Sequence, residues 1–358
     1  MYKSTELEIN KLLMLVLERG ASDLHLVPGK PPVLRIDGAL VELKDYDVLS
    51  GNDINTMLDV LFGSDEKRQQ FREELELDFS FSFKDNIRFR ANAYNQKGYP
   101  AAALRIIPNR IPTIEELNLP AQVKNFSTYT QGLVLLVGPT GHGKSTTLAS
   151  LIDNINHTRT ANIVTIEDPI EFVYLQDKSL INQREVGQDT KSFSKALKSV
   201  LREDANVVLV GEMRDLESIA TTITIAETGH LVFATLHTNN AAQSIDRIID
   251  VFPAYQQDQI KTQLASILVG VVSQRLMPKI GGGRIPATEI MMANNAVRNV
   301  IREGNTHELP NIIHTGGASG MISMDRHIAE LVKSNLVRAE DALMYVSDAD
   351  VFRTMINN

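Results

Sequence analysis

The segment "GPTGHGKS" (residues 138–145) places glycines, a lysine and a hydroxyl side chain at the spacing G-x-x-x-x-G-K-[ST]. An apolar run precedes it, and the stretch "STTLASLIDNI" that begins at its last residue is typical of a helix. Glycines let successive backbone N–H groups turn toward one anion, and a helix N-terminus adds partial positive charge. Lys144 is therefore suited to contact the β- and γ-phosphates of a nucleoside triphosphate, and Ser145 to bind Mg²⁺. A ligand-free glycine-rich turn is the alternative, and the complete order of strand, loop, lysine, hydroxyl and helix disfavours it. The predicted phosphate loop consists of Gly138, Pro139, Thr140, Gly141, His142, Gly143, Lys144 and Ser145.

Carboxylates follow two other apolar runs, at the ends where open α/β sheets bind their ligands. The first segment, "IVTIEDPIEF", offers Glu167, Asp168 and Glu171. The second, "VVLVGEMRD", offers Glu212 and Asp215. We expect Asp215 to cap the helix that follows it. Glu212 comes after four apolar residues and a glycine, so it is expected to project from the carboxyl end of a strand.

The segment "TGHLVFATLHT" contains two histidines, His230 and His237. Seven residues of extended strand span about 23 Å. Zn–N bonds are only about 2.0 Å long, so one ion cannot bind both side chains on a straight strand. His237 leaves the strand at the predicted nucleotide edge, where sensing of a phosphate suits it. His230 is equally compatible with a structural role.

The elements that must position these residues fall into two patterns. Residues 1–20 and 52–61 have helical spacing of apolar side chains, and "LDFSFSFKDNIRFRANAYN" alternates as an antiparallel hairpin with turn residues at Asp85 and Asn86. Asp37-Gly38 is a second turn signal. Residues 1–107 therefore predict a small α+β domain, and the proline-rich residues 108–120 predict a linker.

Residues 121–358 predict an α/β domain. Apolar runs at 133–137, 163–166, 207–210 and 231–236 alternate with helical stretches, which indicates a parallel sheet covered on both faces. From Tyr255 onward the sequence predicts a mostly helical region, interrupted by "GGGR" and "HTGGASG".

The hairpin also carries arginines. Arg88 and Arg90 alternate with the apolar residues of their strand, and Arg105 does the same in "AAALRIIP". Alternation places these side chains on the face away from the core. Such a basic face is usually just solvated.

Composition limits the function classes. The 358 residues are 43% hydrophobic and carry a net charge of −8, which disfavours a surface built to bind nucleic acid or acidic lipid. Cysteine is absent, which excludes disulfides and thiolate-bound metals. The apolar runs are shorter than the roughly 18 residues of a membrane span, and the acidic N-terminus is no secretory signal, so a cytoplasmic protein is expected.

Longer motifs make the sequence similar to the secretion and pilus ATPases, over nearly the whole chain. They are "SDLHL", "PPVLRIDG", "GPTGHGKSTTLAS", "TIEDPIEF", "INQREVG", "VLREDAN", "LVGEMRD" and "AETGHLVFATLHT". Within that family the chain most resembles the retraction ATPases of type IV pili. It lacks the cysteines of the zinc insert typical of the assembly branch, and "AVRNVIRE" (residues 296–303) is similar to the AIRNLIRE motif associated with retraction.

The resemblance implies a PAS-like N-terminal domain joined flexibly to a RecA-like ATPase domain, with six subunits in a ring and ATP bound between domains. It implies that ATP hydrolysis with Mg²⁺ powers pilus retraction and twitching motility. It also implies an inner-membrane platform protein as partner, at the inner face of the membrane at the pilus base.

The resemblance assigns roles by motif. Lys144, Ser145 and Thr146 bind phosphate and Mg²⁺, Glu171 is the general base, and Glu212 orders the Mg²⁺ ion. Where the family usually has serine, this chain has His142, and the sequence does not identify its contact. In such a ring, Arg90 and Arg105 become candidate arginine fingers for the nucleotide of the same or an adjacent subunit.

Three alternatives stay open. The first is an assembly or type II secretion ATPase of the same family. The second is a RecA-like nucleic-acid translocase, disfavoured by the net charge of −8 and by the lack of a basic-aromatic stripe, so no direct nucleic-acid partner is expected. The third is a regulatory nucleotide-binding subunit without turnover, disfavoured by Lys144, Glu171 and Glu212.

Overall fold

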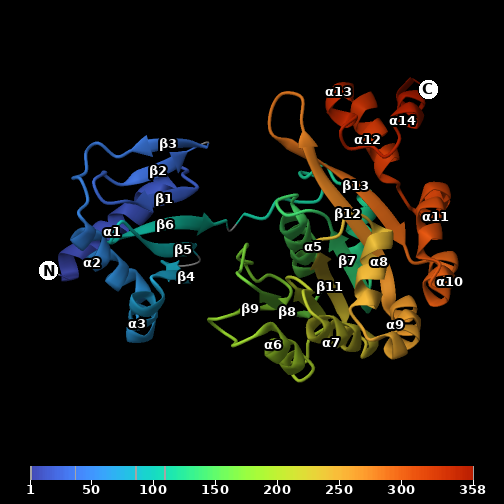
Figure 1. Ribbon diagram of the computed structural model, residues 1–358, viewed down its shortest axis with the longest axis horizontal. Helices are drawn as coiled ribbons and strands as arrows, with labels where there is room; N and C mark the ends of the chain where they lie inside the picture. Colours follow the sequence, from blue (N-terminus) through green and yellow to red (C-terminus); the bar gives the residue numbers. More distant parts are fainter. Residues whose placement is uncertain (1, 37, 85–86, 109, 358) are drawn as a thin grey trace. The chain divides into compact units, whose positions relative to one another are not determined.

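The computed structural model describes residues 2–36, 38–84, 87–108 and 110–357 (Figure 1). These residues form two compact units, Met1–Arg110 and Ile111–Asn358. Each unit combines helices with a β-sheet, so the chain has a mixed α/β fold. Among the described residues, none of the helices has the length and apolar character needed to cross a membrane.

The first unit contains a six-stranded sheet in the order β3-β2-β1-β6-β5-β4. Neighbouring strands pair antiparallel, so side chains alternate between a face that packs on the helices and the opposite face. The strands are β1 (Asp23–Leu26), β2 (Val33–Ile36), β3 (Ala39–Glu42), β4 (Glu76–Phe83), β5 (Ile87–Gln96) and β6 (Tyr99–Ile107). The helices are α1 (Tyr2–Glu18), α2 (Gly51–Phe62) and α3 (Asp65–Glu74).

Both helices predicted in this unit are confirmed. Ile9 and Leu13 of α1 are buried in the core, and a reciprocal capping box of Ser50 and Asp53 starts α2. Helix α3 was not predicted, because its sequence is almost entirely polar, and Phe71 is its one buried side chain within the described residues 65–74.

The predicted hairpin is confirmed as β4 and β5. Phe89 and Ala91 are buried, as the alternating pattern requires. The turn predicted at Asp85 and Asn86 lies outside the described residues, and so does Asp37 of the other predicted turn.

The second unit contains a seven-stranded sheet in the order β13-β12-β7-β11-β10-β8-β9. Strand β13 is antiparallel to β12, and the other neighbouring pairs are parallel. The strands are β7 (Gly132–Val137), β8 (Asn162–Glu167), β9 (Leu180–Glu185), β10 (Val207–Val210), β11 (Leu231–Leu236), β12 (Leu268–Pro278) and β13 (Arg284–Met292). The predicted parallel sheet is therefore confirmed.

Helices cover both faces of this sheet. Leu133 and Leu135 of β7 belong to one core cluster, whereas Val134 and Leu136 belong to another on the opposite face. On the second face the sheet packs on α5 (Lys144–Thr158), and on the first it packs on α6 to α11. Their bounds are α4 (Ala121–Asn125), α6 (Phe193–Val200), α7 (Leu216–Glu227), α8 (Ala241–Asp250), α9 (Ala254–Ile267), α10 (Asn295–Glu303), α11 (Leu309–Thr315), α12 (Met324–Lys333), α13 (Ala339–Ala342) and α14 (Ala349–Asn357).

The expectation of a mostly helical region after Tyr255 is wrong for one segment. Residues 268–292 form the β12–β13 hairpin, and "GGGR" contributes its turn instead of interrupting a helix. The continuous apolar run at the start of β12 does not distinguish a buried strand from a buried helix by periodicity. The remainder is helical, and α12 to α14 form a small core around Phe352 with Met277 and Ile285 of the hairpin.

The proline-rich stretch from Ile111 to Pro120, predicted as part of the linker, packs with the second unit. Ile114 and Leu119 are buried in the core cluster that includes α5. The division between the two units falls after Arg110.

Candidate nucleotide-binding site

The phosphate loop joins the carboxyl end of β7 to the N-terminus of α5. Its lysine, Lys144, is 7% exposed and donates hydrogen bonds to the carbonyl oxygens of Gly138 (2.6 Å) and Pro139 (3.0 Å). Burial lowers the pKa of Lys144, whereas the nearby carboxylates of Glu212 and Glu171 raise it. The ammonium group is thus held inside the loop, where an incoming phosphate can replace the carbonyl oxygens as its partner.

The loop is packed tightly on strand β12. A Cβ atom on Gly138 would collide with the carbonyl oxygen of Gln274, and one on Gly143 would lie 2.9 Å from the Gln274 Nε2 atom. Both glycines also have positive φ angles, 144° and 81°. The sequence motif therefore requires glycine at these positions for space as well as for backbone conformation.

His237 connects the loop to the next strands of the sheet. Its Nδ1 atom lies 3.2 Å from the Thr140 hydroxyl and 3.5 Å from Lys144 Nζ, and its Nε2 atom lies 3.1 Å from Glu212 Oε1. Arg214 holds the other carboxylate oxygen of Glu212 at 2.8 Å. The structure thus brings together four predicted site residues from the carboxyl ends of β7, β10 and β11.

Glu167, at the end of β8, is an additional buried carboxyl group at this edge. It accepts hydrogen bonds from Thr165 (2.7 Å), Gln183 (3.3 Å) and the backbone N–H of Glu171. Burial raises its pKa to about 7, against the effect of these hydrogen bonds. Glu171 itself is exposed, on the segment that follows the cis Asp168-Pro169 bond. Glu167 therefore anchors the chain next to the candidate base Glu171. The segment "IVTIEDPIEF" does not by itself reveal this role.

Other polar residues of these segments have structural roles. Asp215 caps α7 by accepting the Ser218 N–H at 2.8 Å, as predicted. His230 contacts the Ile225 carbonyl oxygen (3.0 Å) and the Thr228 hydroxyl (3.1 Å), at the start of β11. The described residues contain no group of three or more histidine and carboxylate side chains that would hold a metal ion by themselves.

His142, at the loop tip, points toward β12. Its Nδ1 atom accepts a hydrogen bond from the Leu276 N–H at 2.8 Å, and its carbonyl oxygen accepts one from Gln274 Nε2 at 2.8 Å. The contact that the sequence left open is therefore with the sheet of the same unit.

Comparisons with known proteins identify the family of the chain. Residues 3–335 match the family of type II/IV secretion system proteins. The chain belongs to this family. It is 47% identical to the type IV pilus retraction ATPase PilT of Pseudomonas aeruginosa, over 94% of this chain and 97% of that protein. It is 46% identical to a twitching motility protein of Neisseria gonorrhoeae, over 87% of this chain and 83% of that protein. A crystal structure of the pilus retraction motor PilT with bound ADP superposes with a TM-score of 0.89 at 46% identity, covering 97% of this chain and 99% of that one.

In this secretion ATPase, the arginines of the first unit are not equivalent. Arg90 of β5 is exposed and lies directly opposite Arg105 of β6. Arg105 donates to the carboxylate of Asp23 at 2.7 Å, and Arg35 lies 3.7 Å from the same group. Arg88 donates to the Ser80 hydroxyl at 2.8 Å. Arg90 and Arg105 are thus both exposed, and they differ in that Arg105 is paired with the Asp23 carboxylate.

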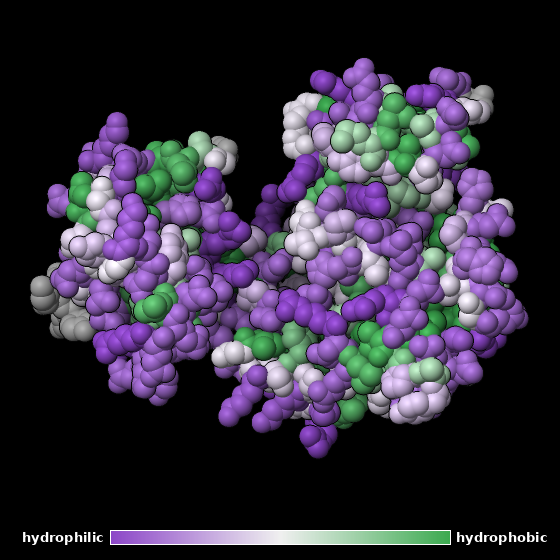
Figure 2. Space-filling view, viewed as in Figure 1, coloured by the Kyte–Doolittle hydropathy of each residue, from purple (hydrophilic) through white to green (hydrophobic). Residues whose placement is uncertain are grey.

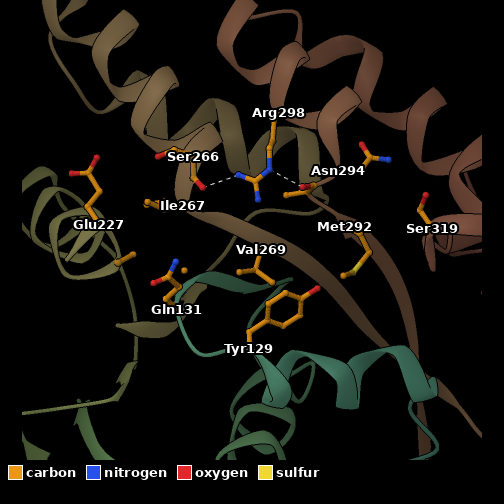
Figure 3. Close-up of a pocket in the computed structure, with 13 residues that line it drawn as sticks. Tyr129, Gln131, Glu227, Ser266, Ile267, Val269, Met292, Asn294, Arg298 and Ser319 are labelled. Carbon is orange, nitrogen blue, oxygen red and sulfur yellow. Dashed lines mark hydrogen bonds between the residues drawn. The ribbon is translucent and has the colours of Figure 1, made fainter. Parts of the chain in front are cut away.

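The "AVRNVIRE" motif of this secretion ATPase forms α10, and its two arginines differ. Arg298 lines a cavity of about 680 Å³ together with Tyr129 and Asn294, and its side chain lies between Ser266 and Asn294 (Figure 3). Its guanidinium group donates to backbone carbonyl oxygens, at Ala293 (2.9 Å), Ser266 (2.7 Å), Leu268 (2.8 Å) and Ala265. Arg302 is exposed and contacts Asn299 of its own helix at 2.7 Å. Residues four apart lie on the same side of a helix, yet Arg298 binds carbonyl oxygens of the surrounding backbone whereas Arg302 is exposed.

Proposed function

We propose that this chain is the ATPase motor that powers retraction of type IV pili, and with it twitching motility. The observation that carries the proposal is the joint placement of Lys144, His237 and Glu212 at one sheet edge. It occurs in a chain that matches a pilus retraction ATPase over nearly all of both lengths.

The proposed chemistry is hydrolysis of the γ-phosphate of ATP. Lys144 and the N–H groups at the start of α5, up to Thr146, bind the phosphates. Glu171, whose carboxylate is exposed, accepts the proton of the attacking water. His237 contacts the γ-phosphate and relays its presence to Glu212.

Mg²⁺ is the metal that fits the oxygen donors at this edge. The Ser145 hydroxyl stands on the first turn of α5, and the Glu212 carboxylate supplies a second oxygen ligand of the type that Mg²⁺ prefers. When bound, the ion neutralises phosphate charge. Glu212 is kept in place by His237 and Arg214.

The proposed assembly is a homohexamer built from a PAS-like first domain and a RecA-like second domain. Arg90 supports it, because an exposed arginine opposite a second arginine leaves positive charge available for a phosphate. The edge strand β3 supports it too. Leu40 and Val41 are 60% and 37% exposed, and a hydrophobic patch lies over β3 in Figure 2, of the kind that a second copy covers. The proposed location is the cytoplasmic face of the inner membrane at the pilus base, on a platform protein.

Two measurements test this function. The purified full chain is expected to hydrolyse ATP without stimulation by DNA and to have the mass of six subunits. Its gene is expected to restore twitching to a cell that lacks its own retraction ATPase. Restoration of piliation without retraction would instead identify an assembly ATPase, and DNA-dependent turnover would identify a translocase.

A further inference from the structure

Strand β12 is longer than its neighbour β7, and this leaves an open edge beside the phosphate loop. The parallel pairing of the two strands ends with Ser273 opposite Val137. Beyond that point β12 continues to Pro278, whereas the segment that follows β7 turns away into the phosphate loop. Backbone N–H groups at such an edge need a partner other than a strand.

The phosphate loop supplies these partners through its tip. The imidazole of His142 accepts the Leu276 N–H at 2.8 Å. Gln274 bridges the same region, since its Nε2 atom donates to the His142 carbonyl oxygen and its Oε1 atom accepts the Thr147 hydroxyl, each at 2.8 Å. Gln274 is 2% exposed, so this bridge is shielded from water. The tip of the loop and the first turn of α5 are therefore fixed to the same stretch of β12.

We propose that His142 is a positioning residue for nucleotide binding, whose neutral imidazole fastens the phosphate loop to β12 so that the loop amides stay aimed at the phosphates. The proposal rests on the proposed ATP site. It assigns to His142 an effect on nucleotide affinity that acts through the loop backbone, without requiring contact with the nucleotide.

The surroundings keep the ring in the accepting form. The charged groups that act on His142 are cations: Arg275 on β12, Arg284 on β13 and Lys144 on α5. Burial and these three charges lower the pKa of His142. A neutral ring with its proton on Nε2 leaves Nδ1 free to accept, whereas a protonated ring cannot accept at all. The fastening should therefore hold at neutral pH and fail on acidification.

The first test compares His142→Ala with His142→Asn in the full-length protein, using a fluorescent ADP analogue as the probe. The Oδ1 atom of asparagine and the Nδ1 atom of histidine are both bonded to Cγ. Asparagine can therefore accept the hydrogen bond from the Leu276 N–H in the same place. Loss of one hydrogen bond of about 0.5–1.5 kcal/mol predicts a Kd about 2- to 10-fold higher for the alanine variant, with recovery in the asparagine variant. The KM for ATP should rise in parallel, with a smaller change in kcat. His157→Ala, at the exposed C-terminal end of α5, is the matched control.

The second test is the pH dependence of ADP affinity, from about pH 8 to about pH 5. Wild-type affinity should fall at the acidic end more than that of His142→Asn, because only histidine gains a proton there. All other side chains of the site are the same in both proteins, so their contributions cancel in the comparison. Thermal unfolding and particle mass show whether the alanine variant folds. If it does not, the pH comparison of wild type with His142→Asn still tests the proposal.

Equal ADP affinity of wild type and a folded His142→Ala variant would overturn the proposal, and so would identical pH profiles of wild type and His142→Asn. Either result requires that the wild-type protein binds ADP. Absence of binding by the wild type would instead count against the proposed function.

Discussion

The imidazole of His237 stands between Glu212 and the phosphate loop, with Nε2 at 3.1 Å from Glu212 Oε1 and Nδ1 at 3.5 Å from Lys144 Nζ. One neutral tautomer satisfies both contacts. Its Nε2–H donates to the carboxylate, and its Nδ1 accepts from Lys144 and from the Thr140 hydroxyl. A nucleotide that draws Lys144 onto its phosphates must therefore alter the contacts of His237, which provides a direct route from the loop to the Glu212 carboxylate.

Lys144→Ala should reduce ATP turnover by about 10²- to 10³-fold, because the developing charge on the phosphates loses a fixed cation. Lys198→Ala is the control. Lys198 is exposed on α6, outside the loop, and its Nζ atom lies 2.6 Å from Glu217 Oε1. Steady-state phosphate release by both variants measures the effect. Wild-type turnover in Lys144→Ala would refute the phosphate-loop interpretation.

Glu171→Gln should bind ATP normally and lose about 10²- to 10⁴-fold in turnover, because an amide cannot accept the proton of the attacking water. Glu212→Gln should instead weaken Mg²⁺-dependent binding and loosen His237 and Arg214, which both contact this carboxylate. Nucleotide titration at several Mg²⁺ concentrations, together with phosphate release, separates the two effects. If Glu212→Gln shows normal binding and no turnover while Glu171→Gln is active, the two roles are reversed.

Glu167 predicts a pH-dependent stability. Its pKa of about 7 in the folded protein exceeds the ordinary value of 4.5, so its contribution to stability is complete below about pH 4.5 and is lost as pH rises through about 7. The loss amounts to about 3 kcal/mol. Glu167→Gln cannot ionise, so the difference in unfolding free energy between about pH 5 and about pH 8 should shrink by that order. Thermal or urea unfolding at the two pH values measures it, with the exposed Glu308→Gln as control. An unchanged pH dependence would mean that Glu167 is ionised in the folded protein.

Arg90 and Arg105 should respond differently to alanine substitution. Arg90→Ala should leave the unfolding temperature unchanged and lower turnover in assembled particles by up to about 10³-fold, if it acts as an arginine finger. Arg105→Ala should lower stability by about 1 kcal/mol, because buried Asp23 loses one of its two arginine partners while the other, Arg35, remains. Turnover across a range of protein concentrations, beside the exposed Arg72→Ala control, tests the pair. Wild-type activity of Arg90→Ala at every concentration would assign Arg90 to the solvated surface.

The sequence predicted the sheet and the nucleotide edge because both depend on local patterns. The four apolar runs between 133 and 236 are too short for buried helices and are flanked by turn or capping residues, and the loop motif has fixed spacing. It did not predict β12 and β13, whose apolar start has no strand-specific period. It also could not predict that Arg298 binds carbonyl oxygens around the end of α9, or that His142 binds Leu276. Those contacts join residues 32 and 134 positions apart, and they exist only once the chain has folded.

Arg302 gives the cleanest test of how ATP hydrolysis is coupled to retraction. Spacing alone suggests replacing Arg298 and Arg302 together, but Arg298 donates to carbonyl oxygens around the end of α9, and its loss would leave them without that partner. Arg298→Ala should therefore lower the unfolding temperature, and a retraction defect in that variant would not distinguish coupling from instability. Arg302 is exposed and donates a hydrogen bond to Asn299 of its own helix. Alanine is a good helix former, so Arg302→Ala should keep α10, the hexamer and near-wild-type ATP turnover. It should nevertheless fail to restore twitching in a retraction-deficient cell, whereas Arg353→Ala, an exposed arginine on α14, should restore it. Normal twitching with Arg302→Ala would show that this side chain does not transmit the motor's work, and would remove the exposed arginine of "AVRNVIRE" from the case for retraction.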